Sequence, residues 1–151
     1  MKHKKTTLLT LLFLTLAGCV SAPRYSEIKG RLPEIPSGQG RVFFYFNGMA
    51  NPGIVRINKQ EILKLGWGTF SFVDRPVGTY TLDTTNSVRA PASFSLESKK
   101  AVYVELSGLV ERTGGDGVSS IRLTSAGIGV AVVPQQQAEK EMREYMQAPA
   151  K

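Results

Sequence analysis

Residues 68–82 read GTFSFVDRPVGTYTL, and this stretch predicts the fold class of the chain. In its first part, residues 69–74, aromatic side chains alternate with polar ones, which is typical of a β-strand with one buried and one solvated face. Pro76 and Gly78 then mark a turn, because proline fixes φ and glycine tolerates positive φ. A second strand is expected over residues 78–84, so we expect the two strands to form a β-hairpin.

Similar segments, each rich in β-branched and aromatic residues and bounded by turn signals, recur on both sides of this hairpin. Further strands are expected at residues 41–47, 53–58, 61–65, 91–97 and 101–108, and two more near 118–124 and 127–133. Residues 58–60 read NKQ and indicate a second hairpin turn. The economical arrangement is a meander of hairpins closing into a sandwich. We therefore predict one all-β domain over residues 41–133, an antiparallel β-sandwich of about eight strands.

The segment at residues 134–151 has a different pattern, that of an amphipathic helix followed by a tail. Prolines at positions 134 and 149 suit the start and the stop of such a helix. The apolar side chains at helical spacing are Ala138, Met142, Tyr145 and Met146. We predict a short C-terminal α-helix over residues 135–147, which either docks on the sandwich or offers its apolar stripe to a partner.

The N-terminal residues 1–18 have the pattern of a secretory signal peptide: three lysines, an apolar segment of about twelve residues and two small residues. A helix that spans a bilayer needs about 20 apolar residues, so this segment is too short to cross one. The only cysteine of the chain, Cys19, follows directly.

Leu16, Ala17, Gly18 and Cys19 resemble the lipobox of bacterial lipoproteins. The resemblance implies cleavage between Gly18 and Cys19, a diacylglyceryl group on the sulfur of Cys19 and acylation of the new amino terminus. Two or three acyl chains make such an anchor effectively permanent, whereas one chain holds only marginally. Since Val20 stands where an aspartate would favour the inner membrane, the resemblance also implies the outer membrane, facing the periplasm. The alternative is an ordinary secreted protein with an incidental cysteine.

Removal of residues 1–18 would leave 133 residues, lower the formal net charge from +7 to +4 and take away the only histidine, His3. With Cys19 acylated, the mature chain would have neither an imidazole nor a free thiol. That composition excludes Ser-His-Asp and Cys-His nucleophilic sites, the usual zinc ligand sets and an intrachain disulfide. We therefore expect no catalytic residues, no metal and no cofactor. A charge of +4 suits solubility or a position near anionic lipid.

Residues 20–40 read VSAPRYSEIKGRLPEIPSGQG, with three prolines and three glycines. Such a composition is typical of a linker, so residues 19–40 are expected to be a lipidated cysteine and a flexible tether. These residues could span at most ~70 Å when extended, which would let the folded domain stand clear of the lipid. Alternatively, residues 25–28 could dock on the domain.

Four motifs resemble the DUF2846 family of bacterial lipoproteins and periplasmic proteins: GQGRVFFYF, IVRINKQEILKL, GTFSFVDRPVGTYTL and FSLESKKAVYVEL. The resemblance covers roughly residues 37–146 and implies a sandwich in the cell envelope. Phe46 stands where the family usually has an arginine, and Lys59 and Gln60 where a glycine is common. Because the function of the family is uncharacterised, the resemblance implies no catalytic residues.

Three aromatic residues are candidates for contact with a ligand. Trp67, flanked by glycines, is either an exposed stacking platform for a sugar ring or part of the packing. Phe43 and Tyr45 point to the face of their strand opposite to Val42 and Phe44. Either that strand is covered on both faces, or it carries an exposed aromatic patch for a partner.

Other patterns are weaker. Residues 113–117 read TGGDG, which lacks the lysine of a phosphate loop and has one aspartate where calcium needs six to eight oxygens, so a hairpin loop is expected. A pair of carboxylates from Glu105, Glu111 or Asp74 could act in a hydrolase only if they met in an open cleft. Arg41 and the aromatics could suit single-stranded nucleic acid, but the export signal argues against that partner.

The sequence thus predicts a lipid-anchored envelope protein that is not an enzyme and that binds or scaffolds an envelope component. Its expected partners are the membrane, through the anchor, and an envelope protein or a glycan. The alternative is a glycan-binding module that uses an exposed Trp67 to hold peptidoglycan or a surface polysaccharide.

Overall fold

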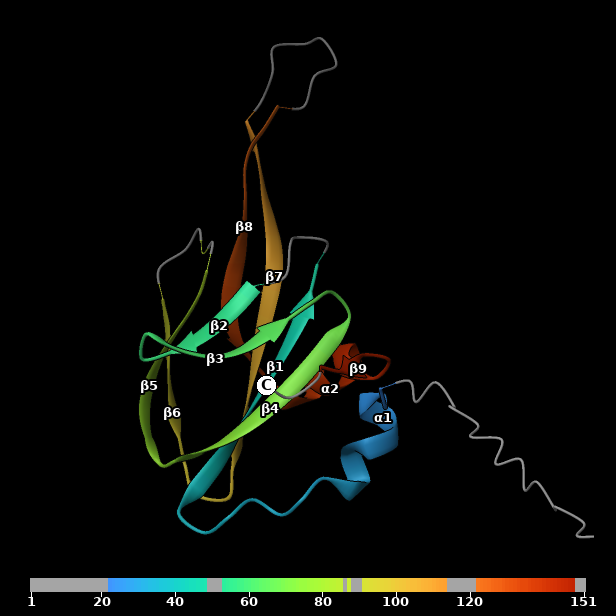
Figure 1. Ribbon diagram of the computed structural model, residues 1–151, viewed down its shortest axis with the longest axis vertical. Helices are drawn as coiled ribbons and strands as arrows, with labels where there is room; N and C mark the ends of the chain where they lie inside the picture. The colour runs from blue at the N-terminus through green and yellow to red at the C-terminus, as the bar shows by residue number, and fades with distance from the viewer. Residues whose placement is uncertain (1–21, 49–52, 86, 88–90, 114–121, 149–151) are drawn as a thin grey trace, which may run out of the picture.

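The computed structural model describes residues 22–48, 53–85, 87, 91–113 and 122–148, and only the backbone of residues 109–113 and 122–126. The expected signal peptide, the expected cleavage and lipidation site at Gly18 and Cys19, and the glycines of the 113–117 loop lie outside this part of the chain. In chain order (Figure 1) the elements are α1 (Tyr25–Ile28), the 3₁₀ turn η1 (Lys29–Arg31), β1 (Gln39–Asn47), β2 (Gly53–Ile57), β3 (Gln60–Leu65), β4 (Thr69–Pro76), β5 (Gly78–Thr84), β6 (Ala92–Leu96), β7 (Ala101–Thr113), β8 (Arg122–Val133), α2 (Gln135–Met142) and β9 (Met146–Gln147).

The described strands form two sheets packed face to face, so the predicted β-sandwich with a C-terminal helix is confirmed. One sheet has the order β8-β7-β1-β4-β9, and the other has the order β3-β2-β5-β6. Most neighbouring strands are antiparallel, but β1 pairs with β7 in parallel, and so does β4 with β9. Parallel strands need a crossover connection. Between β1 and β7 the chain visits the second sheet twice, so the expected meander of consecutive hairpins is wrong.

The turn at residues 76–78 is the clearest difference from the sequence prediction. β4 pairs with β1 and β9 in the five-stranded sheet, whereas β5 pairs with β2 and β6 in the four-stranded one. The expected β4–β5 hairpin is therefore wrong, and the turn carries the chain from one sheet to the other. A period of two indicates a buried face but does not identify the neighbouring strand, which is why the pattern could not exclude this corner.

The second predicted turn is a hairpin, as expected. Ile57 pairs with Gln60 in the antiparallel ladder of β2 and β3, and the two residues between them have positive φ, 50° at Asn58 and 69° at Lys59. Positive φ at both central positions defines a type I′ turn, whose twist matches that of paired strands.

Two boundaries near the C-terminal end differ from the prediction. β8 is one strand over residues 122–133 where two were expected near 118–124 and 127–133, and residues 118–121 lie outside the described part. The small residues Ala126 and Gly127, which read as a break, pair with Val110 and Leu109 and continue the ladder. Helix α2 ends at Met142 rather than at residue 147, because Met146 and Gln147 pair with β4 as strand β9.

The described side chains form two hydrophobic cores, one on each face of the five-stranded sheet. The inner core lies between the two sheets, and the outer core lies between the five-stranded sheet and the helices (Figure 1). The fully buried inner-core residues include Val42, Phe44, Phe46, Val55, Leu65, Leu82, Val104 and Leu106. The outer core consists of Tyr25, Phe43, Tyr45, Phe70, Tyr103, Ala138 and Met142. The helix α2 therefore docks on its own sandwich, through Ala138 and Met142.

The N-terminal segment is docked as well, which was the second of the two alternatives for residues 25–28. Tyr25 is 2% exposed and packs edge-on against the rings of Phe43 and Phe70. The backbone N–H of Tyr25 donates to the carbonyl of Tyr145 at 3.0 Å, and the N–H of Gln147 donates to that of Pro23 at 2.9 Å. The chain is thus bound to the sheet from Pro23 onward, and a flexible tether over all of residues 19–40 is wrong.

None of the helices in the described residues is long and apolar enough to cross a membrane.

Candidate functional site

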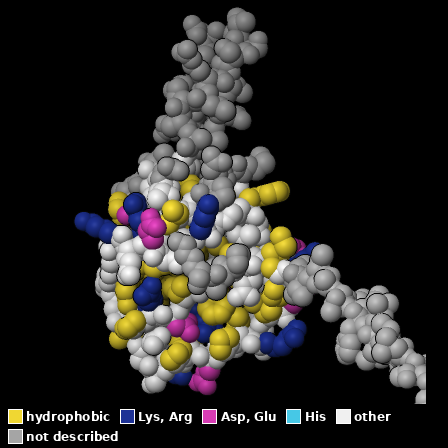
Figure 2. Space-filling view, viewed as in Figure 1, with side chains coloured by type: hydrophobic (Ala, Val, Ile, Leu, Met, Phe, Trp, Pro, Cys, Tyr) yellow, Lys and Arg dark blue, Asp and Glu magenta, His cyan; other side chains and the backbone are white. Residues whose placement is uncertain are grey.

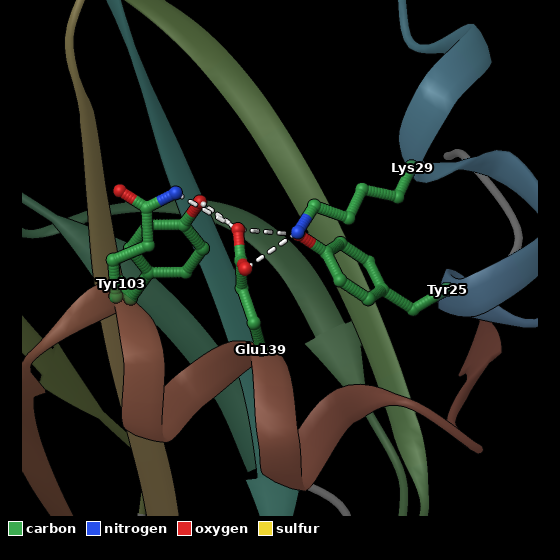
Figure 3. A network of polar contacts seen from close by, with 5 residues as sticks. Tyr25, Lys29, Tyr103 and Glu139 are labelled. Carbon is green, nitrogen blue, oxygen red and sulfur yellow. Dashed lines mark hydrogen bonds and ion pairs between the residues drawn. The ribbon is translucent and has the colours of Figure 1, made fainter.

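A shallow groove of about 370 Å³ runs between α1 and α2 on the outer side of the five-stranded sheet. We call it the helix groove, and its lining residues are Tyr25, Ser26, Lys29, Gln136, Glu139, Lys140 and Arg143. Helix α2 forms one wall because Ala138 and Met142, four residues apart, face the sheet. That orientation places Glu139 next to Ala138, at the side facing α1, where Lys29 and Tyr25 meet it (Figure 3).

Glu139 is the centre of a polar network that joins four elements, α1, η1, β7 and α2 (Figure 3). Its Oε2 accepts a hydrogen bond from Lys29 Nζ at 2.5 Å, and its Oε1 accepts one from Gln135 Nε2 at 2.8 Å. The hydroxyls of Tyr25 and Tyr103 donate to the same Oε1 at 3.5 and 3.4 Å. These tyrosines belong to the outer core, so the network connects the surface of the groove to the packing beneath it.

The protonation states in this network follow from burial and hydrogen bonding. Burial by itself raises the pKa of Glu139, but the hydrogen bonds from Lys29, Gln135 and Tyr103 outweigh it, so the pKa lies below its ordinary value. Burial raises the pKa of Tyr25, and it raises the pKa of Tyr103 to about 12. At neutral pH the tyrosines are therefore neutral donors and Glu139 is an ionised acceptor, an arrangement that holds α1 and α2 to the sheet.

A second cluster lies under the same helix. The hydroxyl of Tyr45 donates to Glu141 Oε2 at 2.6 Å, and Gln137 Nε2 donates to Glu141 Oε1 at 3.1 Å. Burial and then the charge of Glu141 raise the pKa of Glu105, against the hydrogen bond from Asn47 at 3.2 Å. The fold thus brings Glu105 close to a carboxylate that the sequence did not nominate, and both oxygens of that partner accept hydrogen bonds, one from the buried Tyr45 and one from the exposed Gln137.

The other carboxylates considered from the sequence do not join this cluster. Asp74 forms a two-bond ion pair with Arg41, at 2.7 Å to Nε and 2.8 Å to the terminal nitrogen. The guanidinium also donates to the carbonyl of Pro33 and lies 4.5 Å from the ring centre of Phe72. Since Arg41 is 3% exposed, it has a structural role and offers no surface to nucleic acid. The side chain of Glu111 lies outside the described part of the chain.

Phe43 and Tyr45, the two candidate contacts on β1, are buried at 3% and 0% exposure. Phe43 stacks on Tyr103 with ring centres 5.0 Å apart, and Tyr45 reaches Glu141 of α2. Strand β1 is therefore covered on both faces, which was one of the two alternatives, and the exposed aromatic patch is not observed.

Trp67 is the candidate that the structure exposes. Its side chain is 68% accessible at the turn where the chain crosses from β3 to β4, so the exposed one of the two alternatives for Trp67 is observed. The turn itself is well held: Thr69 Oγ1 donates to the carbonyl of Gly66 at 2.7 Å, and the N–H of Gly68 donates to that of Phe46 at 3.3 Å. Gly68 has a φ of +65°, which a glycine adopts without strain. The indole is thus presented to solvent from a fixed backbone.

The Trp67 turn lies next to the point where the N-terminal segment enters the sheet. The N–H of Met146 in β9 donates to the carbonyl of Gly68 at 3.0 Å, and Met146 also forms an isolated bridge with Arg24. Met146 is 47% exposed. We call Arg24, Trp67 and Met146 the tether edge. Sequence reasoning missed this edge because its three members are far apart in the chain and meet only through β9.

On the face seen in Figure 2, basic and acidic side chains are interspersed with hydrophobic ones rather than gathered in one charged field. Within the described residues, no group of three or more histidine, cysteine, aspartate or glutamate side chains could hold a metal ion. Comparison of the chain with protein families, with curated proteins and with solved structures finds no match, so its function is argued from its own residues.

Proposed function

We propose that this protein is a lipid-anchored envelope protein, acylated on Cys19 and held on the periplasmic side of the outer membrane, where it binds or scaffolds an envelope component. The observation that carries the proposal is the lipobox-like motif Leu16-Ala17-Gly18-Cys19 behind a short apolar segment. The resemblance of four further motifs to the DUF2846 lipoproteins supports the same assignment.

The arrangement of ionisable side chains supports binding rather than catalysis. Three of the carboxylates that the fold gathers are held by an oppositely charged or hydroxyl partner, Glu139 by Lys29, Glu141 by Tyr45 and Asp74 by Arg41, and the fourth, Glu105, accepts a hydrogen bond from Asn47. General acid–base catalysis instead needs a group whose protons can reach a substrate in a cleft. These three contacts hold the helices and β1 in place. A structural role therefore accounts for the three carboxylates without a catalytic one.

The test of the anchor is metabolic labelling with radioactive palmitate. The unmodified protein and the control Val20→Ala are expected to incorporate label and to sediment with membranes, because both keep the cysteine. Cys19→Ala is expected to lose the label and to move to the soluble periplasmic fraction. Label that persists in Cys19→Ala contradicts the proposal.

The exposure of Trp67 favours a second candidate function, a glycan-binding module. An exposed tryptophan on a fixed turn can stack on a sugar ring of peptidoglycan or of a surface polysaccharide. Trp67→Ala is expected to abolish binding to purified cell-wall sacculi, while Trp67→Phe keeps part of it. The control Val77→Ala removes another exposed apolar side chain, 51% accessible, and is expected to bind as the unmodified protein does. Equal binding by Trp67→Ala and the control contradicts this candidate.

A further inference from the structure

We propose that the tether edge rests on the lipid surface to which Cys19 is attached, with the indole of Trp67 in the layer of lipid headgroups. The inference rests on the proposed function, because acylation of Cys19 is what brings that surface within reach. It assigns a partner to the exposed Trp67, and the partner is lipid rather than glycan.

The length of chain between the anchor and the fold is the first argument. Pro23 is hydrogen-bonded to Gln147, so the folded part begins four residues after Cys19. An extended residue spans at most about 3.6 Å, so these four residues reach at most about 14 Å. The domain therefore cannot stand clear of the lipid as a tether of residues 19–40 would have allowed. Because the chain between Cys19 and Pro23 is short, the effective concentration of lipid at the tether edge is high.

The position of Trp67 relative to that attachment point is the second argument. Arg24 and the first residues of β4 lie on opposite sides of β9, since Met146 bridges to Arg24 and pairs with Thr69. Neighbouring strands are about 4.8 Å apart, which places Arg24 about 10 Å from the start of β4. Trp67 stands two residues before that start. The Trp67 turn and the point where the N-terminal segment joins the sheet thus lie at the same edge.

The chemistry of the edge suits lipid. Tryptophan favours the membrane interface, where its apolar ring and its polar N–H are both satisfied, and the half-exposed Met146 adds a flexible apolar side chain on the strand whose backbone is bonded to Gly68. The adjacent helix groove contributes Lys140 and Arg143, and among the described side chains neither of these cations forms an ion pair. The backbone carbonyl of Arg143 accepts from Ser26, which keeps this part of the groove next to Arg24. Unpaired cations at that place are attracted to anionic headgroups.

The experiment uses Trp67 as its own probe, because it is the only tryptophan in the chain. The acylated protein is purified from membranes and reconstituted in vesicles of phosphatidylethanolamine and phosphatidylglycerol that carry a spin-labelled lipid. Compared with the unacylated Cys19→Ala variant in detergent-free buffer, Trp67 emission is expected to shift to shorter wavelength. The spin label is also expected to quench this emission, and the indole of Trp67 is expected to become several-fold less accessible to acrylamide.

The matched control moves the single tryptophan to the other end of β4. Trp67→Phe combined with Val77→Trp places it at the 76–78 corner, where Val77 is 51% exposed. The eight residues of β4 separate the two positions by about 26 Å. This variant is expected to keep the emission of a water-exposed tryptophan in the same vesicles and to be quenched by acrylamide but not by the spin label.

The possible results separate the inference from the proposed function. A protein whose mass shows no acyl group overturns both. If the protein is acylated but Trp67 is still quenched by acrylamide and is not quenched by the spin label, the lipid contact alone is overturned. The proposal that Cys19 carries the anchor is then unaffected. Shielding of Trp67 by added sacculus fragments, with no shielding by lipid, also overturns the contact and favours the glycan-binding candidate.

Discussion

The inner and the outer core share strand β1 but are built on different chemistry. Alternate residues of β1 enter the two cores: Phe44 faces the second sheet, whereas Phe43 and Tyr45 face the helices. The inner core is aliphatic and phenylalanine-rich, closed by strands on both sides. The outer core holds three tyrosines, and their hydroxyls reach Glu139 or Glu141 on α2.

The difference shows that the two cores depend on different kinds of specificity. Apolar surface of suitable size and period is sufficient for the inner core, since burial is non-directional. The outer core also needs each buried hydroxyl to find an acceptor, because an unpaired buried polar group is costly. We therefore expect the inner core to dominate stability and the outer core to govern how firmly, and at which pH, the helices are held.

The largest expected effect comes from Phe44→Ala. It removes a fully buried ring between two sheets that cannot move into the space, so the free energy of unfolding should fall by about 3–5 kcal/mol. Phe43→Ala is the matched variant on the opposite face, and there α1 and α2 can shift to fill part of the cavity. Its loss should lie at or below the lower end of that range. Urea unfolding measures both values, and a larger loss for Phe43→Ala would overturn the ranking of the two cores.

Tyr45→Phe should have the next largest effect. It keeps the ring and removes only the hydroxyl that donates to Glu141 at 2.6 Å, and a hydrogen bond to a charged acceptor contributes about 1.5–3 kcal/mol. The control is Tyr80→Phe, whose hydroxyl donates at an exposed site to the carbonyl of Pro76. Its effect should stay below about 1 kcal/mol, because water can replace that bond. Equal losses in urea unfolding would show that the outer core needs no hydroxyl at this place.

Glu139→Gln should cost about 1 kcal/mol at pH 7, since it removes the ion pair with a half-exposed Lys29. The pKa of Glu139 is lower in the folded protein than in the unfolded chain. Its contribution to the free energy of unfolding is therefore complete at pH values above the pKa of glutamate in the unfolded chain, about 4.3. The contribution is lost as the pH falls through the folded value. The difference from the unmodified protein in urea unfolding should therefore vanish in acid. Glu97→Gln is the control, because the Glu97–Lys100 pair is 70% exposed on both sides and should contribute almost nothing.

Glu105→Gln should have the smallest effect and the opposite sign. Burial and the charge of Glu141 raise the pKa of Glu105, so the ionised form is disfavoured in the folded protein. The contribution of Glu105 to stability falls as the pH rises from the pKa of the group in the unfolded chain through its higher pKa in the folded protein. A neutral glutamine, which can still accept from Asn47, should raise the free energy of unfolding at pH 7 by at most about 1 kcal/mol. Thermal unfolding at pH 7 and at pH 4 measures the gain, and a gain that is larger at pH 4 contradicts the assignment.

The candidate site was only partly predictable from the sequence. The exposure of Trp67 was one of two alternatives, since flanking glycines suit an exposed tip as well as a packed ring. Glu139 lies on the charged side of the predicted helix, where such residues usually contact water, and Glu141 has no feature in the sequence that singles it out. The signal that could have identified them was the excess of tyrosines on the outer-core side, since a buried tyrosine hydroxyl usually requires a partner.

The sequence by itself determined where most strands and the helix begin, which residues of β1 point to the same side, and the motif on which the anchor proposal rests. These features are local, because the alternation of side chains and the turn residues act within a few positions. Only the tertiary structure decided that β4 and β5 belong to different sheets, that residues 23–25 complete the edge beside β9, and that Trp67 stands in the open next to them. Those features depend on contacts between distant segments, and a local pattern states that a face is buried without stating what buries it.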